Sequence, residues 1–220
     1  MNKSPAAFTL IELLVVISII AVLAALIMPS LTTVTMNAQM VDALNNARQI
    51  GLAMRMYAGD NNGNFVSGTN AYAQPIAFSN DAFRSLVPTY VDNEKIFTIP
   101  RAVVGSTTTN KTNPYTNILT PGQNAFAYVE GLNSSSNSNW PLIVDEDNGS
   151  GYYTSQDGVV GGQFKGTKAV VIHTDISAAL TPLLGGTNQR YIPEFDDNTQ
   201  NALTVTNYMG SNVQLLEPAH

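Results

Sequence analysis

The sequence predicts an α+β protein in which a long N-terminal helix, transmembrane and then amphipathic, packs on a small antiparallel β-sheet domain. Three observations predict this class. Residues 8–28 are apolar with a single charge. Apolar and small residues then recur every three or four positions, as on one face of a helix. Beyond residue 60, short β-branched and aromatic segments alternate with turn-forming Gly, Asn and Pro.

The composition is poor in charge. Charged residues make up 12% of the chain, about half of the roughly 25% typical of soluble domains. The 23 Asn, 21 Thr and 15 Ser residues therefore supply most of the polarity. The net charge of −6 argues against nucleic acid as a partner, because such binding relies on a basic surface. The absence of cysteine excludes a disulfide framework and a cysteine nucleophile.

The apolar segment 8–28 is long enough to cross a membrane. As a helix, its 21 residues would span about 31 Å, close to the thickness of a hydrocarbon core. Lys3 and the N-terminal amine precede it, which predicts a cytoplasmic N-terminus and a body outside the cytoplasm. Ala24 and Ala25 imitate a signal-peptide cleavage site, but three apolar residues follow them, which disfavours such cleavage.

Glu12 is the one charged residue of this segment. A carboxylate within a membrane span is costly unless it is paired, so its presence indicates a function. The alternative is that Glu12 lies near the headgroups and reaches out to them. If the chain were cut after Ala7, the new terminus would be the amine of Phe8, and Glu12 would lie one helical turn beyond it.

Residues 8–14, Phe-Thr-Leu-Ile-Glu-Leu-Leu, closely resemble the start of type IV pilins and of type II secretion pseudopilins. In that family, prepilin peptidase cuts just before the Phe and methylates the new amine. The resemblance implies cleavage between Ala7 and Phe8 and N-methylation of Phe8. The family usually has Gly before the cut, whereas Ala7 stands here. The resemblance also gives Glu12, Phe8 and the helix-kinking Pro29 roles in assembly.

The resemblance implies a structural filament subunit and not an enzyme. In the family's filaments, the Glu pairs with the N-terminal amine of a neighbouring subunit. The implied partners are copies of this chain and other pilin-like subunits, prepilin peptidase and an inner-membrane assembly platform. The implied location is the bacterial cytoplasmic membrane, with a periplasmic or cell-surface filament after assembly. A type II secretion pseudopilus is favoured over a surface pilus, because the chain lacks the cysteine pair of many pilins. The alternative is a membrane-anchored extracytoplasmic binding module that does not polymerise.

The periodic pattern continues the helix to residue 58, so residues 8–58 would form one helix of about 75 Å, bent or locally unwound at Pro29. The alternative is two helices, with Pro29 opening the second. This division gives a leader (1–7), a helix (8–28 transmembrane, 29–58 amphipathic) and a globular body (59–220). The predicted apolar stripe is Leu31, Val34, Ala38, Val41, Leu44, Ala47, Gly51, Met54 and Tyr57.

The body is expected to hold one short helix and several strands. Residues 81–91 predict a helix with Asp81 as its cap, and residues 96–100 predict a short extended piece. Strands are predicted at 125–129, 141–144, 163–165, 169–174 and 202–209, with loops at 105–122 and 131–139. This order is similar to that of G-type pseudopilin bodies. Relatives often have Asp-Gly in the closing hairpin, whereas Ile176 follows Asp175 here, so this turn must differ.

The acidic residues Asp145, Glu146 and Asp147 could supply oxygen ligands for calcium, as could Asp196 and Asp197. Major pseudopilins often bind calcium in a C-terminal loop. The alternative for residues 145–147 is a solvated turn after a strand.

Other residues offer weaker chemistry. His173 and Asp175 could share one face of a strand, but a structural role for His173 is favoured, and no nucleophile elbow or phosphate-binding loop is present. Tyr152, Tyr153 and Trp140 could be adhesive or carbohydrate-stacking groups, although sealing the edge of a small core is favoured.

Overall fold

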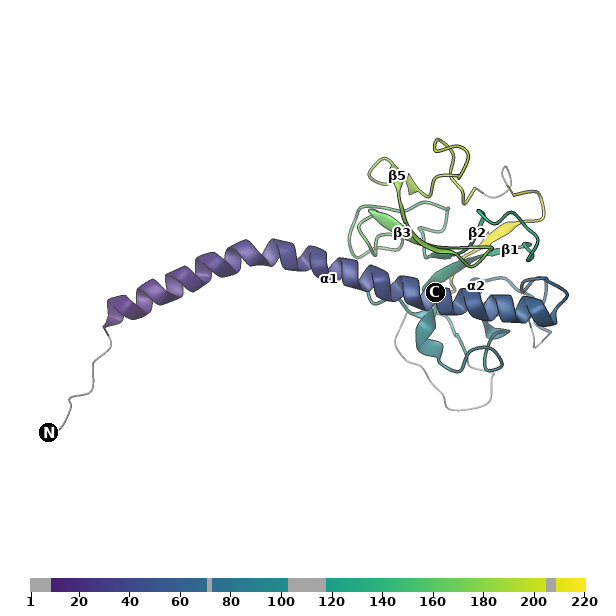
Figure 1. Cartoon of the computed structure of the whole chain (residues 1–220), viewed down its shortest axis with the longest axis horizontal. Helices are drawn as coiled ribbons and strands as arrows, with labels where there is room; N and C mark the ends of the chain where they lie inside the picture. Colours follow the sequence, from purple (N-terminus) through teal and green to yellow (C-terminus); the bar gives the residue numbers. More distant parts are fainter. Residues whose placement is uncertain (1–8, 71–72, 103–117, 205–208) are drawn as a thin grey trace. The chain divides into compact units, whose positions relative to one another are not determined.

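A computed structural model of the chain describes residues 9–70, 73–102, 118–204 and 209–220. The chain divides into two compact units, Met1–Ala38 and Gln39–His220. The division falls within helix α1 (Leu10–Asp60), which is assigned as one helix of 51 residues through Pro29 (Figure 1). The alternative of two separate helices is therefore wrong. The predicted α+β class is confirmed by this helix and by the antiparallel sheet of the second unit.

The first unit leaves its apolar side chains uncovered. Between residues 10 and 28, the exposed fractions of the large apolar side chains run from 47% for Val16 to 81% for Leu10. The most apolar 18-residue window has a mean hydropathy of 3.1, and none of it is buried. By length and composition, the helix can cross a membrane.

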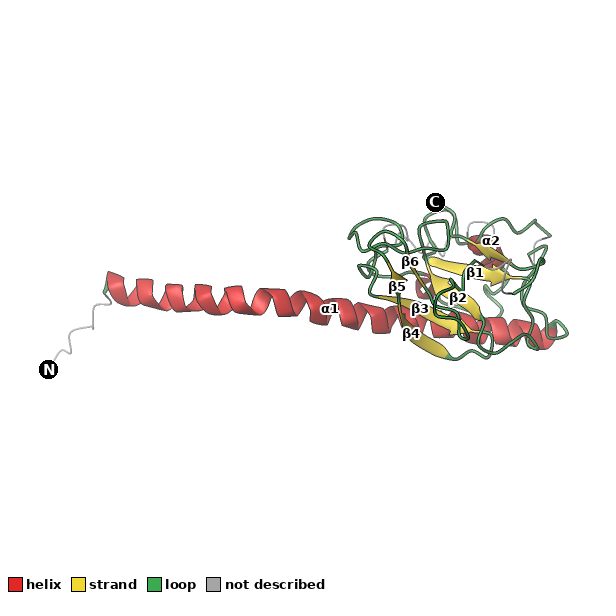
Figure 2. Ribbon diagram, turned by 90° about the horizontal axis from the view of Figure 1, so that it is seen from above, coloured by secondary structure: helices red, strands yellow, loops and turns green. Residues whose placement is uncertain are grey.

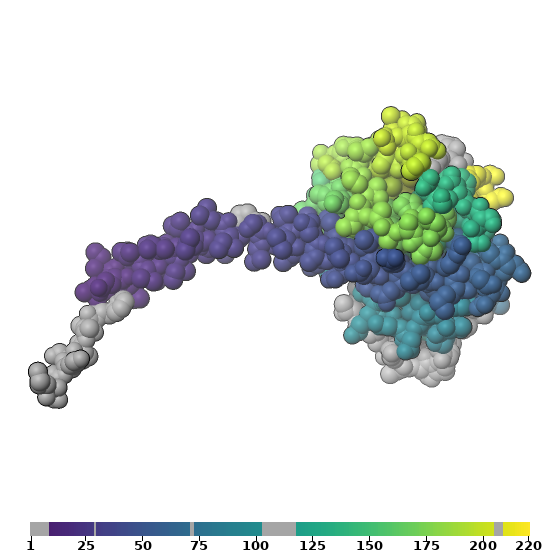
Figure 3. Space-filling view, viewed as in Figure 1, coloured from purple at the N-terminus to yellow at the C-terminus, as the bar shows by residue number. Residues whose placement is uncertain are grey.

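The second unit buries one stripe of α1. Its most buried positions recur at helical spacing, as expected for a helix packed on one side. They are Met40, Ala43, Ala47, Ile50, Gly51, Ala53, Met54 and Ala58. The predicted stripe was right at Ala47, Gly51 and Met54, but Leu31, Val34 and Val41 are 58%, 62% and 48% exposed. Met40 takes the place of Val41, because the sheet selects which side of the helix faces inward. The opposite side of α1 (blue) remains visible on the surface of the body in Figure 3.

Five antiparallel strands form the main sheet in the order β4-β3-β2-β1-β7 (Figure 2). They are β1 (Phe126–Glu130), β2 (Pro141–Asp145), β3 (Lys168–His173), β4 (Ala178–Pro182) and β7 (Gln214–Leu216). Strands β5 (Leu184–Gly185) and β6 (Arg190–Tyr191) form a separate two-stranded sheet. The predictions of strands at 125–129, 141–144 and 169–174 are confirmed within one residue.

Both faces of the main sheet are covered. On one face, Ile172 of β3 lies against Gly51 of α1. On the other face, the strands pack against the C-terminal loops. This second cluster contains Ala127, Val144, Tyr153, Ala169, Val171, Leu183, Ile192, Ala202 and Leu203. Burial on two sides explains why β1 and β2 are apolar along their length instead of alternating with polar residues.

Helix α2 (Ser79–Arg84) is shorter and earlier than predicted, and Asp81 is not its N-cap. The Asp81 carboxylate instead reaches back from the first turn and accepts hydrogen bonds from the backbone N–H groups of Ala77 and Phe78. This contact starts the helix before Asp81. The helix ends ahead of Pro88, which disfavours helical backbone in the residue before it.

Three further predictions differ from the structure. Residues 94–97 form the 3₁₀ helix η1 (Glu94–Phe97) where an extended piece was predicted, because the Asn93 side chain accepts from Lys95 N–H. Residues 163–165 form a turn and not a strand, with Lys165 N–H donating to Gly162 O. Residues 202–204 are not a strand, and positions 205–208 of the predicted strand lie outside the described residues. Most of the predicted loop at 105–122 also lies outside them.

The turn between β3 and β4 brings Ile176 against α1. Ile176 has a φ of +67°, a conformation that is rare for a β-branched residue. Its side chain is nevertheless 9% exposed and lies over Gly51. The expectation that this turn differs from an Asp-Gly turn stays a prediction, because Ile176 adopts the positive φ that Gly favours in such turns. An Ile in place of Gly gains packing against the helix.

Gly51→Leu is expected to lower the free energy of unfolding of the body by about 1–3 kcal/mol. A Cβ at this position would lie 2.8 Å from Ile172 Cγ2 and 3.3 Å from Ile176 Cγ2. Gly59→Leu on the same helix is the control, because a Cβ there meets no atom within 4 Å. Urea unfolding of the full chain in micelles, followed by fluorescence of the single Trp140, measures both. Equal stabilities of the two variants would contradict the prediction.

Candidate functional site

Thr9 and Glu12 form a capping box at the start of α1. Glu12 Oε2 accepts hydrogen bonds from Thr9 N–H at 2.8 Å and from Thr9 Oγ1 at 2.6 Å. In return, Glu12 N–H donates to Thr9 Oγ1 at 3.3 Å. This reciprocal pattern satisfies backbone donors that a helix terminus would otherwise leave open. Sequence reasoning missed Thr9, although the Thr-x-x-Glu spacing of a capping box was visible.

The Glu12 carboxylate lies on an otherwise apolar surface. It lines a shallow depression of about 400 Å³ together with Ile11, Val15 and Val16. The capping box holds the carboxylate at the beginning of the helix, where the side chains of the first turns are exposed. Of the other residues predicted for assembly, Pro29 lies within α1. Ala7 and Phe8 lie outside the described residues.

Asp145, Glu146 and Asp147 are buried at the end of β2, each with at most 1% of its surface exposed. The predicted solvated turn is therefore wrong. Asp145 Oδ1 accepts from Val170 N–H at 2.8 Å, and Asp145 Oδ2 accepts from Gln163 Nε2 at 3.1 Å. Asp147 Oδ1 accepts from three successive backbone N–H groups, those of Gly149, Ser150 and Gly151.

Four acids, together with His220, form what we call the carboxyl cluster: Asp145, Glu146, Asp147 and Glu217. Glu146 Oε1 lies 3.3 Å from His220 Nε2. Glu146 Oε2, Asp147 Oδ2 and Glu217 Oε2 are buried without a hydrogen-bond donor, whereas Glu146 Oε1 has the His220 ring nitrogen beside it. Such acceptors are costly in their ionised form.

Protonation removes part of this cost. Burial raises the pKa of Asp145 to about 8. Burial, with the charges of Asp147 and Asp145, raises the pKa of Glu146 to about 8. Burial also raises the pKa values of Asp147 and Glu217. The two carboxyl groups contact each other, so a protonated Glu217 can donate a hydrogen bond to Asp147. The cluster therefore holds protons at neutral pH.

Calcium binding at residues 145–147 is not supported by this arrangement. Within the part of the chain that the structure describes, no three His, Cys, Asp or Glu side chains are grouped so that they could hold a metal ion. Both carboxylate oxygens of Asp145 and the Oδ1 atom of Asp147 already accept hydrogen bonds from the protein. Asp197 accepts from Thr199 in an exposed turn. Calcium at residues 145–147, or at Asp196 and Asp197, stays a prediction.

Comparison with known families decides the nature of the N-terminal segment. Residues 2–28 match the family model described as the prokaryotic N-terminal methylation motif. The N-terminal segment therefore carries the motif of type IV pilin- and pseudopilin-like proteins. No curated protein and no solved structure matches the chain. The resemblance of the body to G-type pseudopilins therefore has no support beyond the order of its elements.

This methylation motif is that of precursors of the kind that prepilin peptidase processes. Together with the exposed apolar part of α1, it indicates a membrane-anchored, single-pass protein. It also indicates a structural subunit rather than an enzyme.

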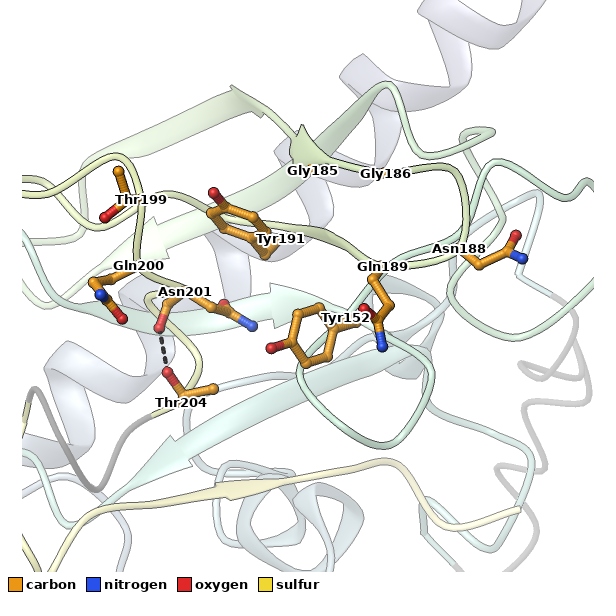
Figure 4. A pocket seen from close by; sticks show the side chains of 10 residues that line it. All are labelled: Tyr152, Gly185, Gly186, Asn188, Gln189, Tyr191, Thr199, Gln200, Asn201 and Thr204. Atoms are coloured by element: carbon orange, nitrogen blue, oxygen red, sulfur yellow. Dashed lines mark hydrogen bonds between the residues drawn. The ribbon is translucent and has the colours of Figure 1, made fainter.

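The other residues considered for chemistry have structural roles or remain at the surface of the body. His173 Nδ1 lies 3.2 Å from Ser177 Oγ within the β3–β4 turn, and burial lowers the pKa of His173. Tyr153 is buried, and its hydroxyl donates to Asp145 O, so its predicted core role is confirmed. Tyr152 is instead half-exposed and lines an open cavity (Figure 4).

Proposed function

We propose that this chain is a structural subunit of a type IV pilus-like filament or a type II secretion pseudopilus. In this proposal, prepilin peptidase cleaves between Ala7 and Phe8 and methylates Phe8. The subunit waits in the cytoplasmic membrane with its body outside the cytoplasm. It then polymerises through α1 with copies of itself and other pilin-like subunits on an inner-membrane assembly platform. The absence of cysteine favours the pseudopilus.

The observation that carries the proposal is an acidic residue on the part of α1, residues 10–28, whose large apolar side chains are all uncovered. Every large apolar side chain described between Leu10 and Met28 is at least 47% exposed. A lipid bilayer can cover these side chains in a lone subunit, and neighbouring helices can cover them in a filament. Placing the Glu12 carboxylate in lipid is costly unless it is paired. The hydrogen bonds of the capping box satisfy only one of its oxygens, Oε2.

Assembly would supply that partner. The amine of Phe8 on a neighbouring subunit would pair with Glu12, and the packed helices would bury both charges. Leaving one partner of such a buried pair alone costs about 3–5 kcal/mol. The pair would therefore set the register between subunits. Pro29, which lacks an N–H for the helical ladder, would supply a point at which α1 can bend as subunits pack.

Glu12→Ala is expected to reduce incorporation into filaments by about 100-fold while leaving membrane insertion intact. Ser18→Ala is the matched control, because Ser18 is a polar residue of the same segment whose hydroxyl bonds only to Val15 O. Quantitative cross-linking of sheared and membrane fractions from the host measures incorporation. Intact mass of the wild type tests processing, with methylated Phe8 as the expected terminus.

Two results would overturn the proposal. Glu12→Ala subunits that enter filaments as efficiently as wild type would remove the role of Glu12. A wild-type chain that stays monomeric in the membrane of its host would identify a tethered binding module instead.

A further inference from the structure

An open cavity of about 680 Å³ lies beside the β5–β6 hairpin, in the range of small-ligand sites (Figure 4). The hairpin supplies one wall, with Gln189 and Tyr191. The turn after β2 supplies Tyr152. Residues 199–204 supply the remaining wall, which includes Gln200 and Asn201. Three segments that are distant in the sequence thus converge on one space.

The inner walls of the cavity are held by hydrogen bonds. The backbones of Tyr153 and Arg190 bond to each other in both directions and join the segment of Tyr152 to β6. Asn201 is 5% exposed, and its side chain donates to Gly151 O at 2.7 Å and accepts from Leu203 N–H at 2.9 Å. Tyr191 is fixed by its hydroxyl, which donates to Asn198 O at 3.1 Å. The two tyrosine rings are therefore presented from supported backbone.

The rim of the cavity carries free amide groups. Asn188, Gln189 and Gln200 are exposed, and among the described residues their side-chain amides make no intramolecular hydrogen bond. Each amide offers two donors and one acceptor in a plane. No charged side chain is among the described residues that line the cavity. The nearby Asp196 and Asp197 and the net charge of −6 disfavour anionic ligands.

This combination fits a sugar. The C–H face of a pyranose ring is apolar and can lie on a tyrosine ring, whereas its hydroxyl groups match the planar amides of the rim. Phosphate or carboxylate ligands would need the cationic groups that the cavity lacks. We propose that the cavity of Tyr152 and Tyr191 binds a neutral saccharide.

Saturation-transfer NMR on the full chain tests the proposal. The chain is kept in phosphocholine micelles, because this detergent has no sugar headgroup. The probes are cellotriose, maltotriose and triacetylchitotriose, with trigalacturonate as an acidic comparison. At least one neutral probe is expected to bind with a millimolar Kd, and trigalacturonate is expected to bind more weakly.

Tyr191→Ala is expected to weaken the binding of that probe by about tenfold or more. Gln189→Ala and Gln200→Ala change exposed side chains, so they preserve the fold, and each is expected to weaken binding several-fold. Tyr90→Ala and Gln49→Ala are the matched controls, because neither residue lines the cavity. Their affinities should equal that of the wild type.

Three outcomes would overturn the proposal: no saturation transfer to any neutral probe, equal affinity of the cavity and control variants, or tighter binding of trigalacturonate. None of these outcomes depends on filament assembly. The test therefore separates the saccharide site from the proposed structural function.

Discussion

Asn80→Ala is expected to lower the free energy of unfolding of the body by about 2–4 kcal/mol. Asn80 is fully buried in α2. Its Nδ2 donates to Leu119 O and Thr120 O, and its Oδ1 accepts from Ala219 N–H and Asn124 Nδ2. One side chain therefore joins α2 to residues 119–120, to the segment before β1 and to the C-terminal residues.

The loss of stability is large because the buried partners of Asn80 cannot form replacement hydrogen bonds with water. After truncation, the N–H of Ala219 would be buried without an acceptor, and each such group costs about 1–3 kcal/mol. Asn124 would keep its bonds to Ser79 and Phe126, so part of the network survives. The cavity left by the amide adds to the cost.

Urea unfolding in micelles, followed by Trp140 fluorescence, measures this loss. Asn45→Ala is the control, because Asn45 is exposed on α1 and its side chain makes no intramolecular hydrogen bond among the described residues. We expect the control to stay within about 0.5 kcal/mol of the wild type. An Asn80→Ala variant as stable as Asn45→Ala would show that the network does not hold the body together.

The N-terminal half of the fold could be predicted because its determinants are local. The hydropathy of residues 8–28 does not depend on what packs against them, and the three- and four-residue period needs only the geometry of a helix. The side of α1 that faces the sheet could not be predicted as reliably. Met40 and Val41 are both apolar and adjacent, and only the sheet decides that Met40 is buried and Val41 exposed.

The central strands were predictable for a related reason. A strand covered on both faces is apolar except near its ends, and β1, β2 and β3 carry that pattern. The strand predicted at residues 163–165 was wrong because the Gln163 side chain donates hydrogen bonds to Asp145 Oδ2 and to Glu146 O. No short window of sequence contains these contacts. The extended piece predicted at residues 96–100 was wrong for a similar reason. The hydrogen bond that the Asn93 side chain accepts from Lys95 N–H outweighed the β-propensity of the segment and favoured helix η1.

The candidate sites show the same contrast. The motif at Glu12 was recognised from the sequence. Its capping partner Thr9 could also have been predicted from the Thr-x-x-Glu spacing. The burial of Asp145, Glu146 and Asp147 could not, because three consecutive acids are usually solvated. The cavity at Tyr152 and Tyr191 needs three separate segments to meet. The short strands β5 and β6, whose hairpin supplies one wall, have no periodicity to reveal them.

The body is expected to lose stability as the pH rises from about 5 to about 8. In the folded chain, the pKa values of Asp145 and Glu146 are raised to about 8, and those of Asp147 and Glu217 are also raised. In the unfolded chain these groups titrate near their ordinary values of about 4. Between these limits the folded state binds more protons, so the free energy of unfolding falls with increasing pH. The stabilisation is complete below about pH 4 and is lost as the pH passes through about 8.

The expected slope is at least about 1.4 kcal/mol per pH unit, the value for one extra proton bound by the folded state, and urea unfolding at several pH values measures it. Glu217→Gln should flatten the slope, because a neutral amide can donate to Asp147 without a proton from solvent. At pH 8 this variant should be more stable than the wild type by about 1–2 kcal/mol. Asp92→Asn, which neutralises an exposed acid, should leave the slope unchanged. A wild-type stability that is constant or rises over this range would mean that the cluster is ionised when folded, and its unpartnered oxygens would then need a cation.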